Sequence, residues 1–459
     1  MAIVLAIVTR QVYLSLGGGV WLGWTILNGW NPLSGLAAAI DGCVAVLADA
    51  GNARMLLFML VIGGLIATVE ASGGVRGFVA DLERREWVNS PRPVRLLTFL
   101  VGVVIFIEST ITILVCGAIG RPLADRYRVS REKLAYLIDS TSAPVCILIP
   151  LNAWGAYVLG ILALPEMNVA DPLGTFVASI PYNFYAWGAL ILAGMVALTG
   201  WNLGPMTRAD ARTRSGELLW PGATPMVDPD VIAPPVETTI PPRAANMLIP
   251  IGVMVLMMPA SLLITGGGDM RAGSGSTSVL WAVLAGLAVA WIMLLIQRAF
   301  TVNGLTKLAI HGAGGLVGLA LLMLLALALA AVANKLGTGA YIANLTAGTM
   351  PPVVFLPVIF LVAAVAGFCT GTSWGTFAIM LPIAVPAAIS LDLPPAPFIA
   401  AALSGGVFGD HASPISDTSV VSSMAAATDH IDHVRTQLPY ALLAAGVATV
   451  GFAIVGAVM

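Results

Sequence analysis

Long apolar runs separated by short polar segments form the main pattern along this chain of 459 residues. Each run is close to twenty residues long, about the length that a helix needs to cross a hydrocarbon core of roughly 30 Å. The pattern predicts an all-α polytopic membrane protein with about nine full spans. The spans are expected near residues 12–30, 55–75, 133–163, 174–199, 246–266, 277–296, 316–334, 396–424 and 438–458.

Two further apolar segments, 93–120 and 352–386, do not fit ordinary single crossings. Basic residues favour the cytoplasmic side of a membrane, and segment 93–120 has basic clusters at both ends. A re-entrant hairpin would keep both clusters in the cytoplasm. Segment 352–386 is too long for one crossing and too short for two, and its flanks are almost free of basic residues, so we expect a second hairpin that enters from outside. The clusters around 93–120 are Arg76, Arg84, Arg85, Arg92 and Arg95, then Arg121, Arg126, Arg128, Arg131 and Lys133.

The order of features in the first half of the chain recurs in the second half. Phe106 corresponds to Phe368, and the polar stretch 139–144 corresponds to 410–414. The single extra crossing between the halves predicts an inverted-topology repeat with two re-entrant hairpins and two broken helices. Chance similarity of two Gly- and Pro-rich halves is the alternative, and the charge pattern argues against it. We expect a first membrane repeat at 1–200, a cytoplasmic Pro-rich loop at 201–245, a linking transmembrane helix at 246–266 and a second, inverted repeat at 267–459.

The composition excludes a soluble protein. Hydrophobic residues make up 58% of the chain and charged residues only 10%, whereas soluble domains carry about 25% charged residues. A formal net charge of −2 argues against nucleic acid as a partner. The four cysteines lie far apart in apolar segments without a CxxC pair, which predicts buried small side chains rather than disulfides or a metal site.

Ionisable residues inside the apolar segments are the candidate functional groups, because a charge at mid-bilayer costs about 2.5–3.5 kcal/mol. Six residues qualify by position: Glu70, Glu108, Asp139, Asp410, His411 and Asp417. Of these, Glu70 lies near a span end, where a structural role is favoured.

The densest polar cluster is Gly409-Asp-His-Ala-Ser-Pro-Ile-Ser-Asp-Thr418. Pro414 is expected to open the helix around residues 410–414 and to free backbone carbonyls. Asp410 and Asp417 are seven residues apart and share a helical face if the helix persists, so one takes a proton or both share a cation. His411 is placed to relay or gate the proton. The alternative is a polar interfacial loop in which such residues cap helices. The oxygen donors that would form a sodium cage here are Asp410, Ser413, Ser416, Asp417 and Thr418.

The first half and both hairpin tips carry similar chemistry. Asp139 is followed by hydroxyls and by a proline, and the alternative is a surface helix cap. Trp374 is a candidate for lining a substrate cavity, with ordinary packing as the alternative. Asp429, His430, Asp432 and His433 are interpreted as a solvated loop rather than a metal site. The remaining candidate ion- and proton-binding residues are Ser140, Thr141 and Ser142 beside Asp139, Glu108, Ser109 and Thr110 in the first tip, and Thr370, Thr372 and Ser373 in the second.

The segments Gly371-Thr-Ser-Trp-Gly-Thr376 and 409–418 closely resemble the NhaC-type sodium/proton antiporter family, within the ion transporter superfamily. Arg121-Pro-Leu-Ala-Asp125, followed by 139–144, is similar to the first-half pattern of that group. The resemblance implies a fold with two hairpins and two broken helices, and exchange of cytoplasmic sodium for external protons. Similar proteins exchange organic acids or take up amino acids, so the resemblance leaves the cargo open.

The sequence therefore predicts a secondary active sodium/proton antiporter of the cell inner membrane that works by alternating access. Sodium is expected at Asp410, Ser413, Asp417 and Thr372, with Ser416 and Ser373 completing the coordination. The alternative couples the same ion site to a small organic solute, an amino acid or a carboxylate. A passive channel would need a continuous polar stripe along several spans, and an enzyme would need a nucleophile–base pattern; the sequence shows neither. Expected partners are the lipid bilayer, the cation, the organic solute of the alternative and a second copy in a homodimer, with no cofactor.

Overall fold

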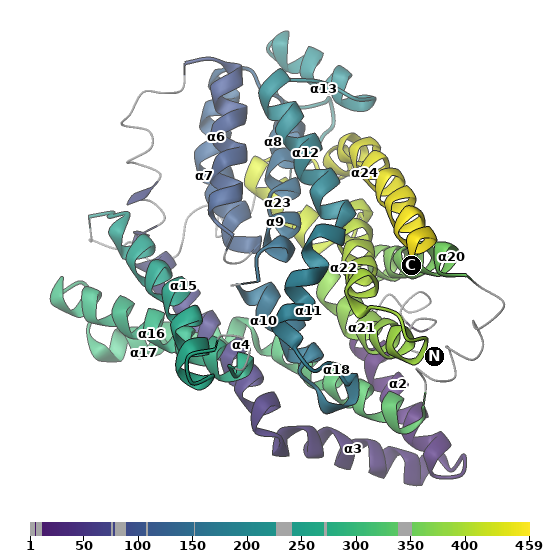
Figure 1. Cartoon of the computed structure of the whole chain (residues 1–459). Helices are drawn as coiled ribbons and strands as arrows, with labels where there is room; N and C mark the ends of the chain where they lie inside the picture. The colour runs from purple at the N-terminus through teal and green to yellow at the C-terminus, as the bar shows by residue number, and fades with distance from the viewer. Residues whose placement is uncertain are drawn as a thin grey trace.

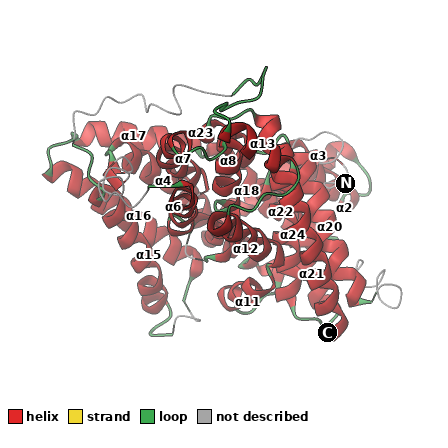
Figure 2. Ribbon diagram, turned by 90° about the horizontal axis from the view of Figure 1, so that it is seen from above, coloured by secondary structure: helices red, strands yellow, loops and turns green. Residues whose placement is uncertain are grey.

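A computed structural model of the chain describes residues 5, 12–74, 77–78, 89–106, 109–150, 152–225, 241–269, 273–337 and 351–459. Within these residues the regular secondary structure consists of helices and no strand, as Figure 2 shows. The prediction of an all-α protein is confirmed.

The helices of the first half follow the predicted spans closely, with one addition (Figure 1). Asn31 caps a helix over residues 32–48 that the sequence analysis did not predict and that bends by 118° from the helix before it. The helices are α2 (Val12–Leu27), α3 (Pro32–Ala48), α4 (Ala50–Ala71), α6 (Pro91–Val104), α7 (Ser109–Arg126), α8 (Arg131–Ser140), α9 (Ala143–Leu148), α10 (Ala153–Leu162), α11 (Pro172–Ser179) and α12 (Phe184–Thr199).

The second half has the same order of hairpin, broken helix and long helix. A short polar helix, α13 (Pro205–Arg214), lies within the predicted loop 201–245, of which residues 226–240 fall outside the described part. The remaining helices are α15 (Ala245–Thr265), α16 (Gly275–Ile296), α17 (Val302–Gly315), α18 (Val317–Lys335), α20 (Pro352–Thr370), α21 (Ser373–Ser390), α22 (Pro395–Ala412), α23 (Asp417–Ala426) and α24 (His430–Val458).

Many of these helices suit a membrane. Among the described residues, 6 helices are long and apolar enough to cross it, or up to 8 if each bent pair is one span. Both arms of the second hairpin, α20 and α21, belong to this set, although segment 352–386 was expected to be too short for two crossings. The number of spans and the opposed orientation of the two halves stay predictions.

Proline causes the break between α22 and α23, which begins within the expected range 410–414. The helix continues to Ala412, and Ser413 takes an extended conformation with ψ 130°. The ring of Pro414 disfavours the helical conformation for the residue before it, so the chain leaves the helix at Ser413. Asp410 and Asp417 therefore belong to different helices, so the condition under which they would share one helical face, a continuous helix, is not met.

Two glycines let α22 lie directly against α20. A side-chain carbon at Gly405 would collide with the carbonyl of Phe360, and one at Gly409 would collide with the backbone of Ala364 and Phe368. Small residues of this kind allow close helix packing in membranes, where apolar burial between helices contributes little. The packing fixes the end of α22, and with it Asp410, against the second hairpin.

Candidate ion-binding site at the broken helices

Asp410 lies at the centre of a small group of buried hydroxyls. Its side chain is 1% exposed. Ser373 donates a hydrogen bond to its Oδ2 at 2.7 Å, and Ser416 donates one to its Oδ1 at 2.6 Å. Thr418 lies 3.1 Å from the Ser416 hydroxyl. A carboxylate beside hydroxyl oxygens is the donor set that a hard monovalent cation or a proton takes.

Two helix N-termini meet at this carboxylate. Ser373 is the first residue of α21, and Ser416 is the N-cap of α23, where its oxygen also accepts a bond from the backbone of Ser419. The positive end of a helix dipole stabilises negative charge, so both helices favour an ionised Asp410. The break after Pro414 and the hairpin tip at Gly371 create these two N-termini. Gly371 has φ +66° and lies against the carbonyl of Ile415, which only a glycine can do without strain.

The second buried carboxylate, Asp139, has a different set of partners. Gln437 donates to its Oδ2 at 2.6 Å, and Ser419 donates to the same atom at 3.0 Å. Ser422 donates to Oδ1 at 3.4 Å. These donors come from α23 and α24, so Asp139 of the first half is bound by the second half. Figure 1 shows α23 beside α8 in the middle of the molecule.

His411 of the second half contacts two residues of the first half, Asp139 and Tyr185. Its Nε2 lies 3.0 Å from the backbone oxygen of Asp139 and 3.7 Å from the carboxylate Oδ1, and its Nδ1 lies 3.1 Å from the hydroxyl of Tyr185. His411 follows Asp410 in the chain, and its ring contacts Asp139. The imidazole therefore links the two buried carboxylates. The structure thus brings Asp139, Asp410, His411, Ser373 and Ser416 together.

Other predicted residues turn away from this centre. Thr141 and Ser142 bond to carbonyls of their own helix, as Thr370 does in the hairpin. Ser413 donates to the carbonyl of Phe368 at 2.7 Å, which holds the break against the hairpin tip. Thr372 is the half-buried N-cap of α21. Ser140 and Ser109 are buried, and Glu70 is exposed at the end of α4.

Three predictions fall outside the described residues. They concern Glu108 and the side chains of Thr110 and Asp417.

Several functional candidates were missed from the sequence, and one interpretation is wrong. His433 is not in a solvated loop: it is fully buried in α24 and hydrogen-bonds to Gln437 and Ser423. Gln437 and the serines of α23 escaped notice because amides and hydroxyls carry no charge that marks them in a hydropathy pattern. The spacing of Ser419, Ser422 and Ser423, which puts them on one helical face, is the signal that could have found them.

Buried ion pairs hold the polar end of α8. Glu132 and Arg212 form a two-pronged pair at 2.8 and 3.0 Å, and Lys133 pairs with Asp210 at 3.0 Å. Burial alone would raise the pKa of Asp210, but the charge and hydrogen bond of Lys133 and the amide of Asn202 outweigh it and lower that pKa below its ordinary value. These pairs tie the helix that carries Asp139 to α13.

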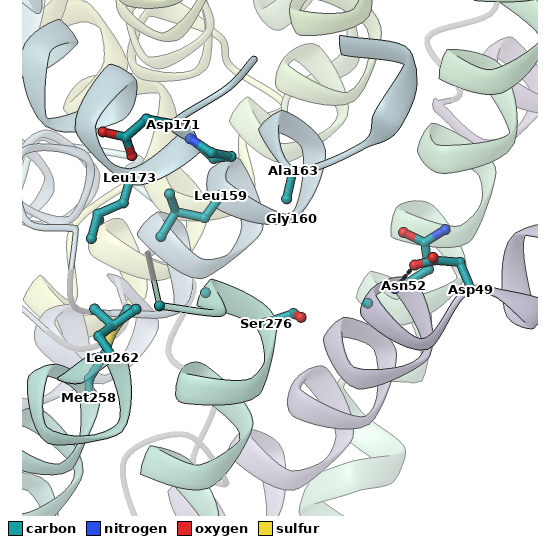
Figure 3. Close-up of a pocket in the computed structure, with 14 residues that line it drawn as sticks. Asp49, Asn52, Leu159, Gly160, Ala163, Asp171, Leu173, Met258, Leu262 and Ser276 are labelled. Atoms are coloured by element: carbon teal, nitrogen blue, oxygen red, sulfur yellow. Dashed lines mark hydrogen bonds between the residues drawn. The ribbon is translucent and has the colours of Figure 1, made fainter. Parts of the chain in front are cut away.

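Trp374 packs rather than facing open space. Its ring lies 4.9 Å from that of Trp154 and 4.8 Å from that of Tyr157, and it is nearly buried. Figure 3 shows a cavity elsewhere, of about 90 Å³, whose lining includes Asp49, Asn52 and Asp171 and no residue of the Asp410 group. A cavity of about 460 Å³ shares Asp49 and Asn52 with it. The role of Trp374 in substrate binding stays a prediction.

Comparison with known proteins identifies the family. The sequence profile of the Na⁺/H⁺ antiporter family matches residues 3–164 and 158–457. The chain belongs to the Na⁺/H⁺ antiporter family. This membership confirms the resemblance seen in the motifs and makes the protein a multi-pass membrane protein and a secondary transporter, in a family of transporters rather than enzymes.

Relatives of this antiporter-family chain differ in what their names say they carry. An uncharacterised protein of Haemophilus influenzae is 33% identical over 99% of this chain and 89% of its own length. A protein of Bacillus subtilis named malate-2H⁺/Na⁺-lactate antiporter is 35% identical over 23% of this chain and 22% of its own. The solved structure of the YdaH transporter of Alcanivorax borkumensis shares the fold, with a TM-score of 0.63 over 98% of each chain at 14% identity.

Proposed function

We propose that this protein exchanges sodium for protons across the cell inner membrane by alternating access. The observation that carries the proposal is the buried Asp410 carboxylate with hydroxyls of Ser373 and Ser416 on its two oxygens. An ionised carboxylate at this depth needs a cation, and a protonated one does not. Sodium and a proton therefore compete for one group, and such competition couples their opposite movements.

The hydroxyls serve both occupants. A serine hydroxyl has one hydrogen and two lone pairs, so it donates to an ionised carboxylate or turns its oxygen toward a cation. Asp417, Thr372 and Ser413 are the further ligands we propose for sodium. The hydroxyl of Ser413 donates its hydrogen to the hairpin carbonyl of Phe368, which leaves an oxygen lone pair for the cation.

Alternating access is supported by where the group lies. Asp410 is held between a broken helix and a hairpin tip, and Asp139 of the other half is reached through His411. Transporters with discontinuous helices place their sites at such breaks, and movement of one half against the other exposes the site to each side in turn.

A second candidate cargo is a small organic acid or amino acid coupled to the same ion site. The name of the Bacillus subtilis relative, which includes malate and lactate beside sodium and protons, favours this candidate. The chemistry of Asp410 is the same in both cases, so the cargo has to be measured.

Purified protein in proteoliposomes with an internal pH dye tests both candidates. Sodium, lithium, potassium and choline are added in turn, followed by malate, lactate and a panel of amino acids. We expect sodium to move protons and Asp410→Asn to reduce the rate at least about 100-fold. Proton movement with an organic solute but with no cation would overturn sodium/proton exchange in favour of the second candidate.

Asp392→Asn is the matched control for the same chemical change. Asp392 is exposed, lies at the end of α21 and has φ +57°, a conformation that asparagine also adopts readily. This variant should transport like the wild type. An Asp410→Asn protein that is folded and fully active would contradict the role of Asp410 itself.

A further inference from the structure

A second group of titratable side chains lies where α23 meets α24. The Ser423 hydroxyl is 3.0 Å from Nδ1 of His430 and 2.8 Å from Nδ1 of His433. The same hydroxyl donates to the backbone oxygen of Ser419 at 2.7 Å. Two histidines thus share one serine, and the function proposed above uses none of the three side chains.

The surroundings of His433 fix the proton on one of its nitrogens. The Gln437 Nε2 faces two acceptors, a carboxylate oxygen of Asp139 at 2.6 Å and the backbone oxygen of His411 at 3.0 Å. Gln437 must therefore present its oxygen to His433, whose Nε2 lies 3.0 Å away and has to carry a hydrogen. The Nδ1 of His433 also lies 3.3 Å from the Ser419 carbonyl, which can only accept. Both ring nitrogens face acceptors, an arrangement that an imidazolium satisfies fully.

His430 adds to the demand for protons. Its Nε2 lies 2.7 Å from the carbonyl of Pro414, so this nitrogen also carries a hydrogen. If both rings are neutral, the two Nδ1 atoms and the Ser419 carbonyl compete for the one hydrogen of Ser423. Each added proton removes one competitor and creates one donor to the serine oxygen. The hydrogen-bond count therefore favours a pair that holds at least one added proton, and repulsion between the two rings opposes a second.

His411 shows that not every buried histidine here has this property. One of its nitrogens faces the backbone oxygen of Asp139, and the other faces the Tyr185 hydroxyl, which can donate. A neutral ring satisfies both contacts. The Asp139 carboxylate, 3.7 Å from Nε2, attracts a proton to His411 by its charge, but no hydrogen bond there is left unmet. An unmet hydrogen-bond demand for a proton is thus specific to the pair around Ser423.

The charges around the pair also favour a cation. Among the helices packed against α24, α12 and α20 contain no charged residue. The Glu132–Arg212 ion pair joins α8 to α13 and is neutral as a pair. A second neutral pair, Lys133 with Asp210, joins the same two helices, and Arg131 of α8 pairs with Asp125. The other charged groups or histidines on these elements are Asp139 on α8, Arg208 and Arg214 on α13, Asp410 and His411 on α22, Asp417 on α23, and Asp429, Asp432 and the exposed Arg435 on α24 itself. The remaining titratable side chains, Tyr136, Tyr185, Cys369 and Tyr440, are neutral in their protonated form.

We propose that His430, Ser423 and His433 form a proton-binding site that holds α24 to the break between α22 and α23 and slows transport while it is protonated. His430 bonds to the carbonyl of Pro414, which lies within that break. Two residues further along, Ser416 donates a hydrogen bond to Asp410. Hydrogen bonds from an imidazolium are stronger than those from a neutral ring. Protonation therefore restrains the segment that has to move around Asp410, and deprotonation releases it.

Proton binding at this site can be tested without measuring transport. Only the regulatory role of the site rests on the proposed function. Backbone hydrogen exchange of residues 413–433 is measured in detergent at about pH 6 and about pH 8.5 and corrected for intrinsic rates. We expect about tenfold more protection at the lower pH in the wild type and in Ser278→Ala. Ser278 is also a buried serine, and its hydroxyl has no hydrogen-bond partner in the described part of the chain. Ser423→Ala and the double variant His430→Gln/His433→Gln should lose this difference, and equal protection at both pH values in the wild type would overturn the proposal.

The pH dependence of transport tests the regulatory role. In proteoliposomes the rate of the wild type should rise with pH, whereas the double variant should keep its full rate about one pH unit further toward acid. The exposed His311 on α17 provides the matched control, and His311→Gln should follow the wild-type profile. A double variant with the wild-type pH profile overturns the regulatory role even if the exchange data show a proton site. Absence of any transport in the wild type would instead count against the proposed function, while the exchange experiment still decides the proton site.

Discussion

Asp139 on the first broken helix and Asp410 on the second are both buried, but different groups surround them. The donors to Asp139 include the amide of Gln437, which can only donate from the nitrogen that faces the carboxylate. The described donors to Asp410 are the hydroxyls of Ser373 and Ser416, which can reverse their role. Gln437 therefore fixes Oδ2 of Asp139 as an acceptor, which favours the anion there, whereas both oxygens of Asp410 face hydroxyls that suit either a proton or a cation.

The helices that carry these two aspartates also differ in how they are held in place. Two buried ion pairs, Glu132 with Arg212 and Lys133 with Asp210, anchor α8 to α13. By contrast, α22 and α23 contain no Lys or Arg and are held by glycine packing and hydroxyl bonds. The comparison predicts that the first broken helix stays fixed during the proposed transport cycle and that the second one changes.

The sharpest way to break this comparison is to neutralise each aspartate in turn. Asp139→Asn removes the anion that Gln437, Ser419 and Ser422 bind, so we expect the free energy of unfolding to fall by about 1–3 kcal/mol. Asp410→Asn should leave the unfolding temperature nearly unchanged while transport is lost, because the amide oxygen accepts from one serine and the amide nitrogen donates to the other, whose hydroxyl can turn. Thermal unfolding in detergent and proton flux in vesicles, measured on the same preparations, distinguish the two variants. The comparison fails if Asp410→Asn is the less stable protein.

The sequence alone was a good guide to the fold. The expected spans match the observed helices because apolar runs of membrane length are explicit in a hydropathy pattern. The unpredicted helix α3 was missed because a turn at Gly29 and Trp30, both with positive φ, redirects the chain at the short polar stretch Asn28-Gly-Trp-Asn-Pro32, after the end of the first apolar run. Hydropathy records burial in lipid and carries no information on such a turn.

The site was harder to predict because its partners come from distant parts of the chain. Asp410, Ser416 and Ser373 could be nominated, since prolines and glycines mark the break and the hairpin tip. The contacts of Asp139 could not, because Gln437 lies 298 residues away and nothing local indicates that it points at a carboxylate. His433 was misassigned for a related reason: a polar residue near a helix start resembles a loop until the packing of α8 over it is known.

A pair of serine variants sharpens the comparison at smaller scale. Ser416→Ala removes one hydroxyl from Asp410, and Ser422→Ala removes one from Asp139. Loss of one hydrogen-bonding oxygen should raise the KM for sodium about fivefold in Ser416→Ala. Ser422→Ala should leave that KM unchanged, because Asp139 does not exchange its partners. Sodium titrations of proton flux measure both, and equal KM changes would show that the two carboxylates act alike.

The smallest expected effect concerns the anchor of the first broken helix. Since the folded pKa of Asp210 is lowered from 3.8, its carboxylate contributes stability that is fully present above pH 3.8 and is lost as the pH falls through the lower folded value. Asp210→Asn should unfold at a lower temperature than the wild type at neutral pH, because Lys133 loses its partner. This difference should shrink as the pH falls below 3.8 and vanish below the lowered folded pKa, where the wild-type carboxylate is also neutral. The KM for sodium at neutral pH should stay the same, since α8 positions the fixed anion and not the exchanging one. A difference in unfolding temperature that is constant over this pH range would show that Asp210 does not anchor α8 through its charge.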